Sequence, residues 1–182
     1  MAVTRDANFS SSLSFNETTT LGDQTQVEKY FLSTNTSIPP TGTGGVPTNW
    51  FNGYAKSTGT LASGETLALS LMAVPHQAIS GVDVNRSFTH INAFYFEPTS
   101  STGVDDKFII RATGTNPFTN LFYGGSGDLN GHYVRAYDSF NYVDYYGSAV
   151  GAPQIMIYIH NSGSLNGPAG LDYKYMVVGA TG

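Results

Sequence analysis

Short runs of β-branched and aromatic residues recur along the chain, and turn-forming residues separate them. Such runs are typical of strands, whereas Gly or Pro interrupts nearly every window that a helix would need. In the run 153–160, every second residue from Ile155 to Ile159 is isoleucine, so these three are expected to face a core. We predict ten strands, at residues 9–15, 26–33, 65–72, 88–97, 107–113, 119–123, 131–137, 140–146, 153–160 and 171–178.

The number of strands and the turns between them predict an all-β fold, an antiparallel β-sandwich of jelly-roll type. The last run, 171–178, shows how such strands sort their residues. Asp172 and Lys174 should face solvent, which turns Tyr173 and Tyr175 inward. We therefore expect tyrosine in the core of the sandwich.

Two segments depart from the alternating pattern. Residues 1–24 are rich in Ser and Thr and are predicted to form an N-terminal arm or a first strand, ahead of a single sandwich domain over residues 25–182. Residues 33–64 are dense in Thr, Gly and Pro and show no period. A loop of this length in a compact domain is usually functional, and the alternative is a flexible arm.

The chain's only tryptophan lies in this long loop, close to two other large rings. A purely flexible linker would not usually carry Trp50, Phe51 and Tyr54 so close together. We expect these rings to dock, either onto the protein's own sandwich or onto a neighbouring subunit or ligand.

Composition narrows the possible functions. The 182 residues include no cysteine, which excludes disulfides, thiolate zinc sites and a cysteine nucleophile. The net charge is −5 and the basic residues are scattered singly, so nucleic acid is not an expected partner. No apolar run approaches the roughly 20 residues that span a bilayer, and the start lacks the apolar segment of a signal peptide. We expect a soluble protein made in a cytoplasm, without a membrane partner.

No motif for catalysis or metal binding is recognisable. A nucleophile elbow is lacking, and the four histidines are isolated in sequence. His90 and Glu97 fit part of a cupin-type metal pattern, but the second nearby histidine is missing. Asp128 and Asn130 belong to a Gly-rich segment that reads as a turn rather than a calcium loop. We predict a protein that is not an enzyme and has no metal or cofactor.

Residues 132–147 carry five of the twelve tyrosines. In a strand, Arg135 shares a face with Tyr133 and Tyr137, and burying an unpaired charge costs several kcal/mol. Both tyrosines are therefore expected on the more solvated face, with Val134 turned to the core.

The strand 140–146 has a polar residue on each face, so both faces are expected to be half-buried, as against a neighbouring subunit. Tyrosine suits such surfaces, because it joins a large apolar ring to a polar tip. A sugar-binding surface is also possible, with Asp138, Asn141 and Asp144 beside the rings. The candidate interface or ligand surface comprises Trp50, Phe51, Tyr54, Tyr133, Arg135, Tyr137, Tyr142, Tyr145 and Tyr146.

The opening "MAVTRDANFSSSLSFNETTTLG", the Thr/Gly/Pro segment and the final "DYKYMVVGATG" resemble small β-sandwich structural proteins of tailed-phage virions, of the head decoration or minor capsid type. The resemblance implies a non-enzymatic protein on the outer capsid surface, made in the host cytoplasm. It also implies a homo-oligomer, most often a trimer, that binds a capsid shell protein and stabilises the shell. The alternative is a carbohydrate-binding or receptor-binding β-sandwich module.

Overall fold

The computed structural model contains two compact units, Met1–Pro40 and Thr41–Gly182. In the first unit it describes the backbone of residues 7–21 and 24–38. In the second unit it describes residues 53–77, 83–99, 107–122, 131–135, 138–163 and 170–181, without the side chains of Tyr145 and Tyr146.

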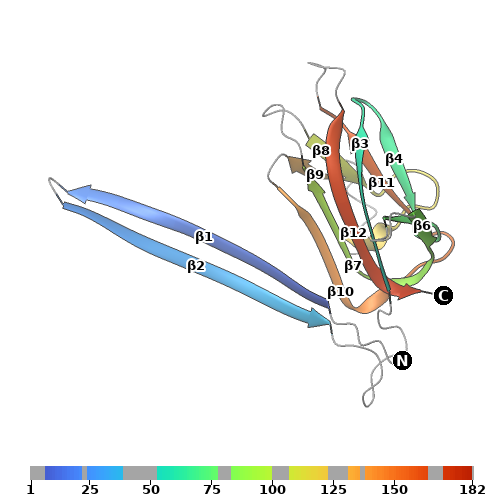
Figure 1. Cartoon of the computed structure of the whole chain (residues 1–182), viewed down its shortest axis with the longest axis horizontal. Coiled ribbons are helices and arrows are strands. Elements are labelled where there is room, and N and C mark those ends of the chain that lie inside the picture. Colours follow the sequence, from blue (N-terminus) through green and yellow to red (C-terminus); the bar gives the residue numbers. More distant parts are fainter. Residues whose placement is uncertain are drawn as a thin grey trace, which may run out of the picture. The chain divides into compact units, whose positions relative to one another are not determined.

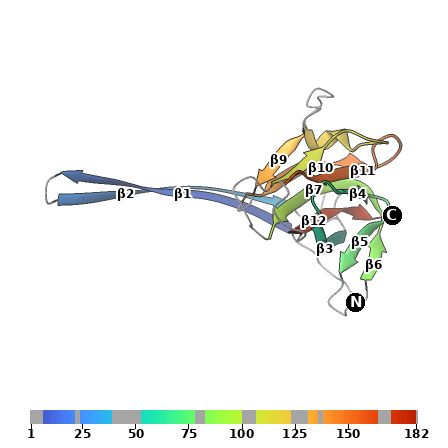
Figure 2. The same ribbon diagram turned by 90° about the horizontal axis from the view of Figure 1, so that it is seen from above.

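The second unit is built from two four-stranded antiparallel sheets (Figures 1 and 2). The first, termed the β7 sheet, has the strand order β10 (Phe140–Ala149), β7 (Phe88–Pro98), β12 (Leu171–Thr181) and β3 (Gly53–Leu61). The second, termed the β8 sheet, has the order β4 (Thr66–Ser70), β11 (Met156–Asn161), β8 (Lys107–Arg111) and β9 (His132–Arg135). A short hairpin adds β5 (Val74–Gln77) and β6 (Asp83–Arg86).

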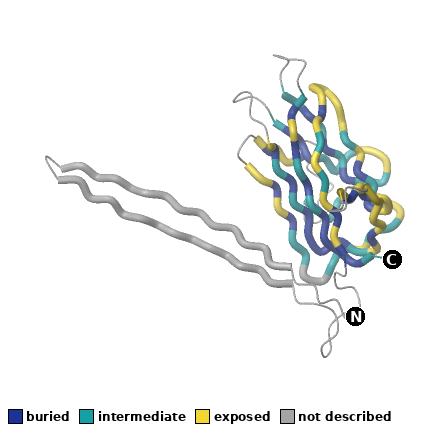
Figure 3. The backbone as a smooth tube through the Cα atoms, in the orientation of Figure 1, coloured by how far each residue is buried: buried dark blue, intermediate teal, exposed yellow. Residues whose placement is uncertain are grey.

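Aromatic rings from both sheets form the centre of the core. The ring of Phe96 on β7 lies edge-on to Phe108 on β8, with centroids 5.1 Å apart, and Tyr173 on β12 lies 5.9 Å from Phe108. All three are buried, and buried positions concentrate in the long strands of both sheets (Figure 3). The predicted all-β class and antiparallel sandwich are confirmed, and the strand order is compatible with a jelly roll.

Two of the predicted alternations agree with the observed burial. Ile157 and Ile159 are buried in β11, although Ile155 is only half-buried. Tyr173 and Tyr175 are buried in β12. The polar tip of Tyr175 is satisfied, because its hydroxyl donates to the Pro75 carbonyl at 2.9 Å.

The predicted strand at 119–123 is wrong over its described part. Thr119–Phe122 form a 3₁₀ helix, η1. Residues three apart share a side of such a helix, and the buried Phe118 and Leu121 are spaced in this way. The turn before it places Asn116 at φ 52°, which ends any extended conformation.

The first unit is a long hairpin of β1 (Ala7–Leu21) and β2 (Gln24–Ile38). The strands pair antiparallel along their whole length, and only Gly22 and Asp23 separate them in sequence. Fifteen residues per strand correspond to a ribbon about 50 Å long. We term this hairpin the arm. Residues 1–24, for which an N-terminal arm or a first strand is predicted, contain all of β1, and nearly all of its partner strand β2 lies within residues 25–182.

The predicted long loop is also shorter than residues 33–64. Residues 33–38 belong to β2 and residues 53–61 form β3, while 39–52 lie outside the described residues. The helical structure within the described residues has neither the length nor the apolar character needed to cross a membrane.

Candidate functional site

The β9 strand sorts its residues as the sequence predicts. Tyr133 is 48 % exposed and Arg135 is exposed, whereas Val134 between them is fully buried. Lys107, on the neighbouring strand β8, places its amine 5.1 Å from the centre of the Tyr133 ring, a cation–π arrangement. Tyr137 lies outside the described residues.

Tyr142 does not belong to a surface, which corrects the prediction. It is only 6 % exposed, and its ring packs edge-on against Phe118 at 6.5 Å. Its hydroxyl lies 2.7 Å from Ser148 Oγ, which in turn donates to Asp144 at 2.7 Å. These hydrogen bonds satisfy the polar tip and allow the ring to enter the core.

The backbone of Tyr145 and Tyr146 lies in a bulge of β10. Val143 pairs with Ala93 and Ser148 with Ile91, so five steps along β10 oppose two steps along β7. The buried Asn92 faces this bulge and donates from Nδ2 to the Asp144 carbonyl at 3.3 Å. A bulge re-aims the residues that it carries, but the two tyrosine side chains lie outside the described part of the chain.

Tyr54 docks onto its own unit. Its ring meets His76 of β5 edge-on at 5.2 Å, although Tyr54 remains 40 % exposed. His76 Nδ1 accepts a hydrogen bond from the Lys56 backbone N–H at 3.2 Å, which covers part of the free edge of β3. Burial, followed by the charges of Arg86 and Lys56, lowers the pKa of His76, so the neutral acceptor form is favoured. Trp50 and Phe51 lie outside the described residues.

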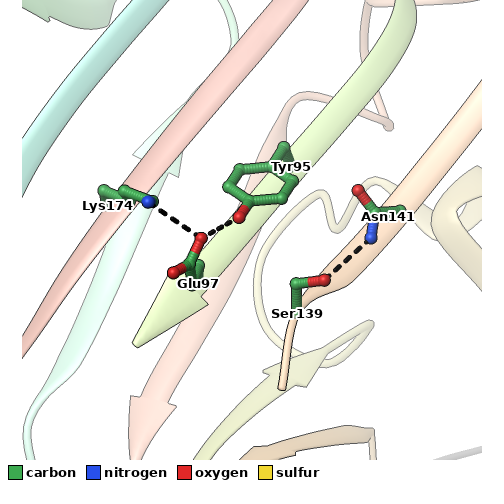
Figure 4. Close-up of polar contacts among 5 residues, drawn as sticks. All are labelled: Tyr95, Glu97, Ser139, Asn141 and Lys174. Carbon is green, nitrogen blue, oxygen red and sulfur yellow. Dashed lines mark hydrogen bonds and ion pairs between the residues drawn. The ribbon is translucent and has the colours of Figure 1, made fainter. Parts of the chain in front are cut away.

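The outer face of the β7 sheet carries a polar cluster that the sequence reasoning missed. Tyr95 and Glu97 on β7 face away from the core, and Lys174 pairs with Glu97 in the strand register. The Tyr95 hydroxyl donates to the Glu97 carboxylate, and Lys174 Nζ lies 2.9 Å from Glu97 Oε2. Figure 4 shows the hydroxyl and the amine both directed at one carboxylate oxygen, Glu97 Oε2, with the Asn141–Ser139 hydrogen bond at the start of the neighbouring strand β10.

An open hollow of about 350 Å³ adjoins this cluster. Tyr95, Met176 and Lys174 line it on β7 and β12, and Lys56, Thr58 and Gln77 line it on β3 and β5. The strand register places Tyr95 beside Met176 and Met176 beside Lys56, so one row of residues crosses three strands. We term this surface the Tyr95 hollow.

A signal for this site existed in the sequence. Tyr95 alternates with the buried Phe94 and Phe96, and it shares its face with Glu97. The argument that assigned Tyr133 to the surface through Arg135 applies equally to Tyr95 through Glu97.

The register of the arm divides its residues into two unlike faces, because successive residues of a strand belong to opposite faces. On one face eight of sixteen residues are apolar, whereas on the other only two of fourteen are. We term the first the apolar face; its apolar residues are Ala7, Phe9, Leu13, Phe15, Leu21, Tyr30, Leu32 and Ile38. The opposite face consists mainly of Ser, Thr and Asn.

Among the residues whose side chains are described, no three His, Asp or Glu residues group in a way that would hold a metal ion. His160 lies 3.0 Å from the Thr66 hydroxyl. Burial, with the charge of Arg111, lowers the pKa of His160. Comparison with known proteins adds no functional assignment: the chain matches no protein-family model and no curated protein.

Proposed function

We propose that the protein is a non-enzymatic structural protein of a virion, a decoration or minor capsid protein on the outer capsid surface. It works through protein–protein contacts made by its arm. The carrying observation is that the arm is a separate two-stranded unit with one apolar face. A two-stranded hairpin is at best marginally stable in water, so an arm of this length is stabilised when a partner covers its apolar face.

The dimensions of the arm suit a subunit contact. A ribbon about 50 Å long and about 10 Å wide offers about 500 Å² on one face. Covered by a matching surface, it buries about 1,000 Å² in total, at the lower end of specific interfaces. We favour a homo-oligomer, a trimer, that also binds a capsid shell protein. Such contacts are then repeated in every copy of the chain, which strengthens the assembly.

The partner surface should supply a positive charge. Glu17 and Glu28 stand opposite each other in the register and lie on the apolar face. Like charges directly opposite are destabilising in a hairpin. A Lys or Arg on the docking surface would relieve this repulsion and determine where along the arm the partner sits.

The strand order supports a viral role at the level of fold analogy. Leaving the β5–β6 hairpin aside, every connection in the sandwich except β8 to β9 crosses from one sheet to the other. We infer from this order that the sandwich is a jelly roll of two Greek keys, an architecture found in viral capsid proteins and in lectins.

Two charge variants of the whole chain test the role of the arm. Leu13 and Leu32 are paired on the apolar face, and Ser12 and Ser33 are paired on the opposite face. We expect the Leu13→Asp/Leu32→Asp variant to lose self-association in size-exclusion chromatography with light scattering. The Ser12→Asp/Ser33→Asp variant adds the same charge to the same strands and should keep it.

The proposal is wrong if the unmodified chain stays monomeric at high concentration and is missing from purified particles of the virus that encodes it. Equal behaviour of the two charge variants would remove the arm from the explanation. Capsid, portal or tail genes next to its gene are the expected genomic setting.

A further inference from the structure

We propose that the Tyr95 hollow binds a saccharide, with one pyranose ring seated over Tyr95 and Met176. This inference goes beyond the proposed assembly role. It involves the outer face of the β7 sheet and none of the residues of the arm.

The ring of Tyr95 is held in place before any ligand arrives. Its hydroxyl is bound by Glu97, and Glu97 is held in turn by Lys174 at 2.9 Å. Tyr95 and Met176 are half-buried, so both are partly fixed by packing and still reach the surface. A preorganised surface loses less entropy when a ligand binds.

The floor and the rim of the hollow match the two kinds of surface on a sugar ring. An aromatic face carries negative charge density and attracts the positively polarised C–H groups on the apolar face of a pyranose. Lys56, Thr58 and Gln77 are exposed around the hollow. Lysine donates, while threonine and glutamine both donate and accept. Sugar hydroxyls also donate and accept hydrogen bonds, so they find both donors and acceptors around the hollow.

Size and charge narrow the ligand class. A volume of about 350 Å³ lies near the lower end of the range for ligand pockets, roughly 300–1,000 Å³, which suits one or two sugar rings. The charged residues that line the hollow are two lysines, Lys56 and Lys174, of which Lys174 is paired with Glu97. A neutral or acidic sugar is therefore favoured over a cationic amino sugar.

A single ring should bind weakly, with a dissociation constant on the order of 1 mM. Display on an oligomer raises the apparent affinity for a multivalent glycan by a factor on the order of 100 or more. The appropriate probe is therefore a glycan array of neutral and acidic oligosaccharides, incubated with the whole chain. Titration calorimetry with the free oligosaccharide of the strongest signal follows.

Three variants locate the site. Tyr95→Ala should lower the affinity at least tenfold, because it removes the ring. Tyr95→Phe keeps the ring and loses only the bond to Glu97, so it should retain most of the affinity. His132→Ala removes another exposed ring, on the β8 sheet, and should bind as the unmodified chain does. Thermal unfolding shows whether each variant is folded.

No binding to any glycan on the array overturns the proposal, as does binding that Tyr95→Ala leaves unchanged or that His132→Ala reduces equally. Light scattering on the same samples separates this result from the assembly role. A monomer that is missing from purified particles but binds glycan through Tyr95 would refute the assembly role alone, and an oligomer without glycan binding would refute the saccharide site alone.

Discussion

Replacing Phe96 by alanine tests the orientation of β7 between the core and the outer face. The Phe96 side chain is fully buried. Its ring centre lies 5.1 Å from that of Phe108 and 5.7 Å from that of Tyr173. Truncation removes the ring at the centre of the core and leaves a cavity between the two sheets.

Large-to-small changes of this kind cost about 3–5 kcal/mol, a sizeable part of the roughly 5–15 kcal/mol that stabilises a typical domain. For a unit the size of Thr41–Gly182, each kcal/mol corresponds to a shift of about 4 °C in the midpoint of thermal unfolding. We therefore expect Phe96→Ala to lower this midpoint by roughly 10–20 °C, as measured by circular dichroism or calorimetry.

Tyr95→Ala is the matched control, since it alters the preceding residue on the opposite face of the same strand. Tyr95 is half-buried and its hydroxyl bonds to Glu97 at the surface. Its truncation should cost about 1 kcal/mol. Equal losses in the two variants, or a larger loss for Tyr95→Ala, would refute the orientation of β7 and with it the Tyr95 hollow.

Two further predictions concern a buried histidine and two glycines. In the folded state, burial lowers the pKa of His76 below the usual histidine value of 6.5. The contribution of neutral His76 to stability is therefore present above pH 6.5 and is lost as the pH falls through the folded-state pKa. We expect the midpoint temperature of unfolding to fall as the pH is lowered below about 6.5, the usual histidine value. His76→Gln should reduce this dependence, and a slope equal to that of the unmodified chain would refute the assignment to His76. Gly64 and Gly131 both have positive φ, but an added Cβ is unobstructed at Gly64 and meets the Ile110 carbonyl oxygen at Gly131. In denaturant unfolding, Gly64→Ala should lower the free energy of unfolding by about 1 kcal/mol and Gly131→Ala by about 2–4 kcal/mol. Similar losses in the two variants would contradict a collision between the added Cβ and the Ile110 carbonyl oxygen.

Strands were predicted well from the sequence where large apolar residues alternate with other residues within the strand itself, as in β11 and β12. Strand β3 was missed because the inward positions of that strand are small. Gly59 pairs with Tyr173 in the register, and a Cβ on Gly59 would meet the Tyr173 ring. The apolar contact over β3 is therefore supplied by the rings of β12, more than 100 residues later in the chain. A pattern read along one strand cannot contain this information, because the filling residue belongs to its neighbour.

The tyrosines show why the number of rings in a segment is a poor guide to a binding surface. Tyr142 lies in the tyrosine-rich stretch, yet its hydroxyl is satisfied by Ser148 and its ring is buried. Tyr95 lies outside that stretch and still reaches the surface beside a charged pair. The charged residue two positions away distinguishes the exposed rings, since a carboxylate or guanidinium on the same strand face keeps that face in water. Asp144 is two positions from Tyr142 but does not keep the Tyr142 ring in water. The bulge of β10 begins at Asp144, and the Ser148 hydroxyl donates to the Asp144 carboxylate. A charged residue on the same strand face therefore indicates an exposed ring only where the strand is regular. The bulges of a strand have to be located before this rule is used.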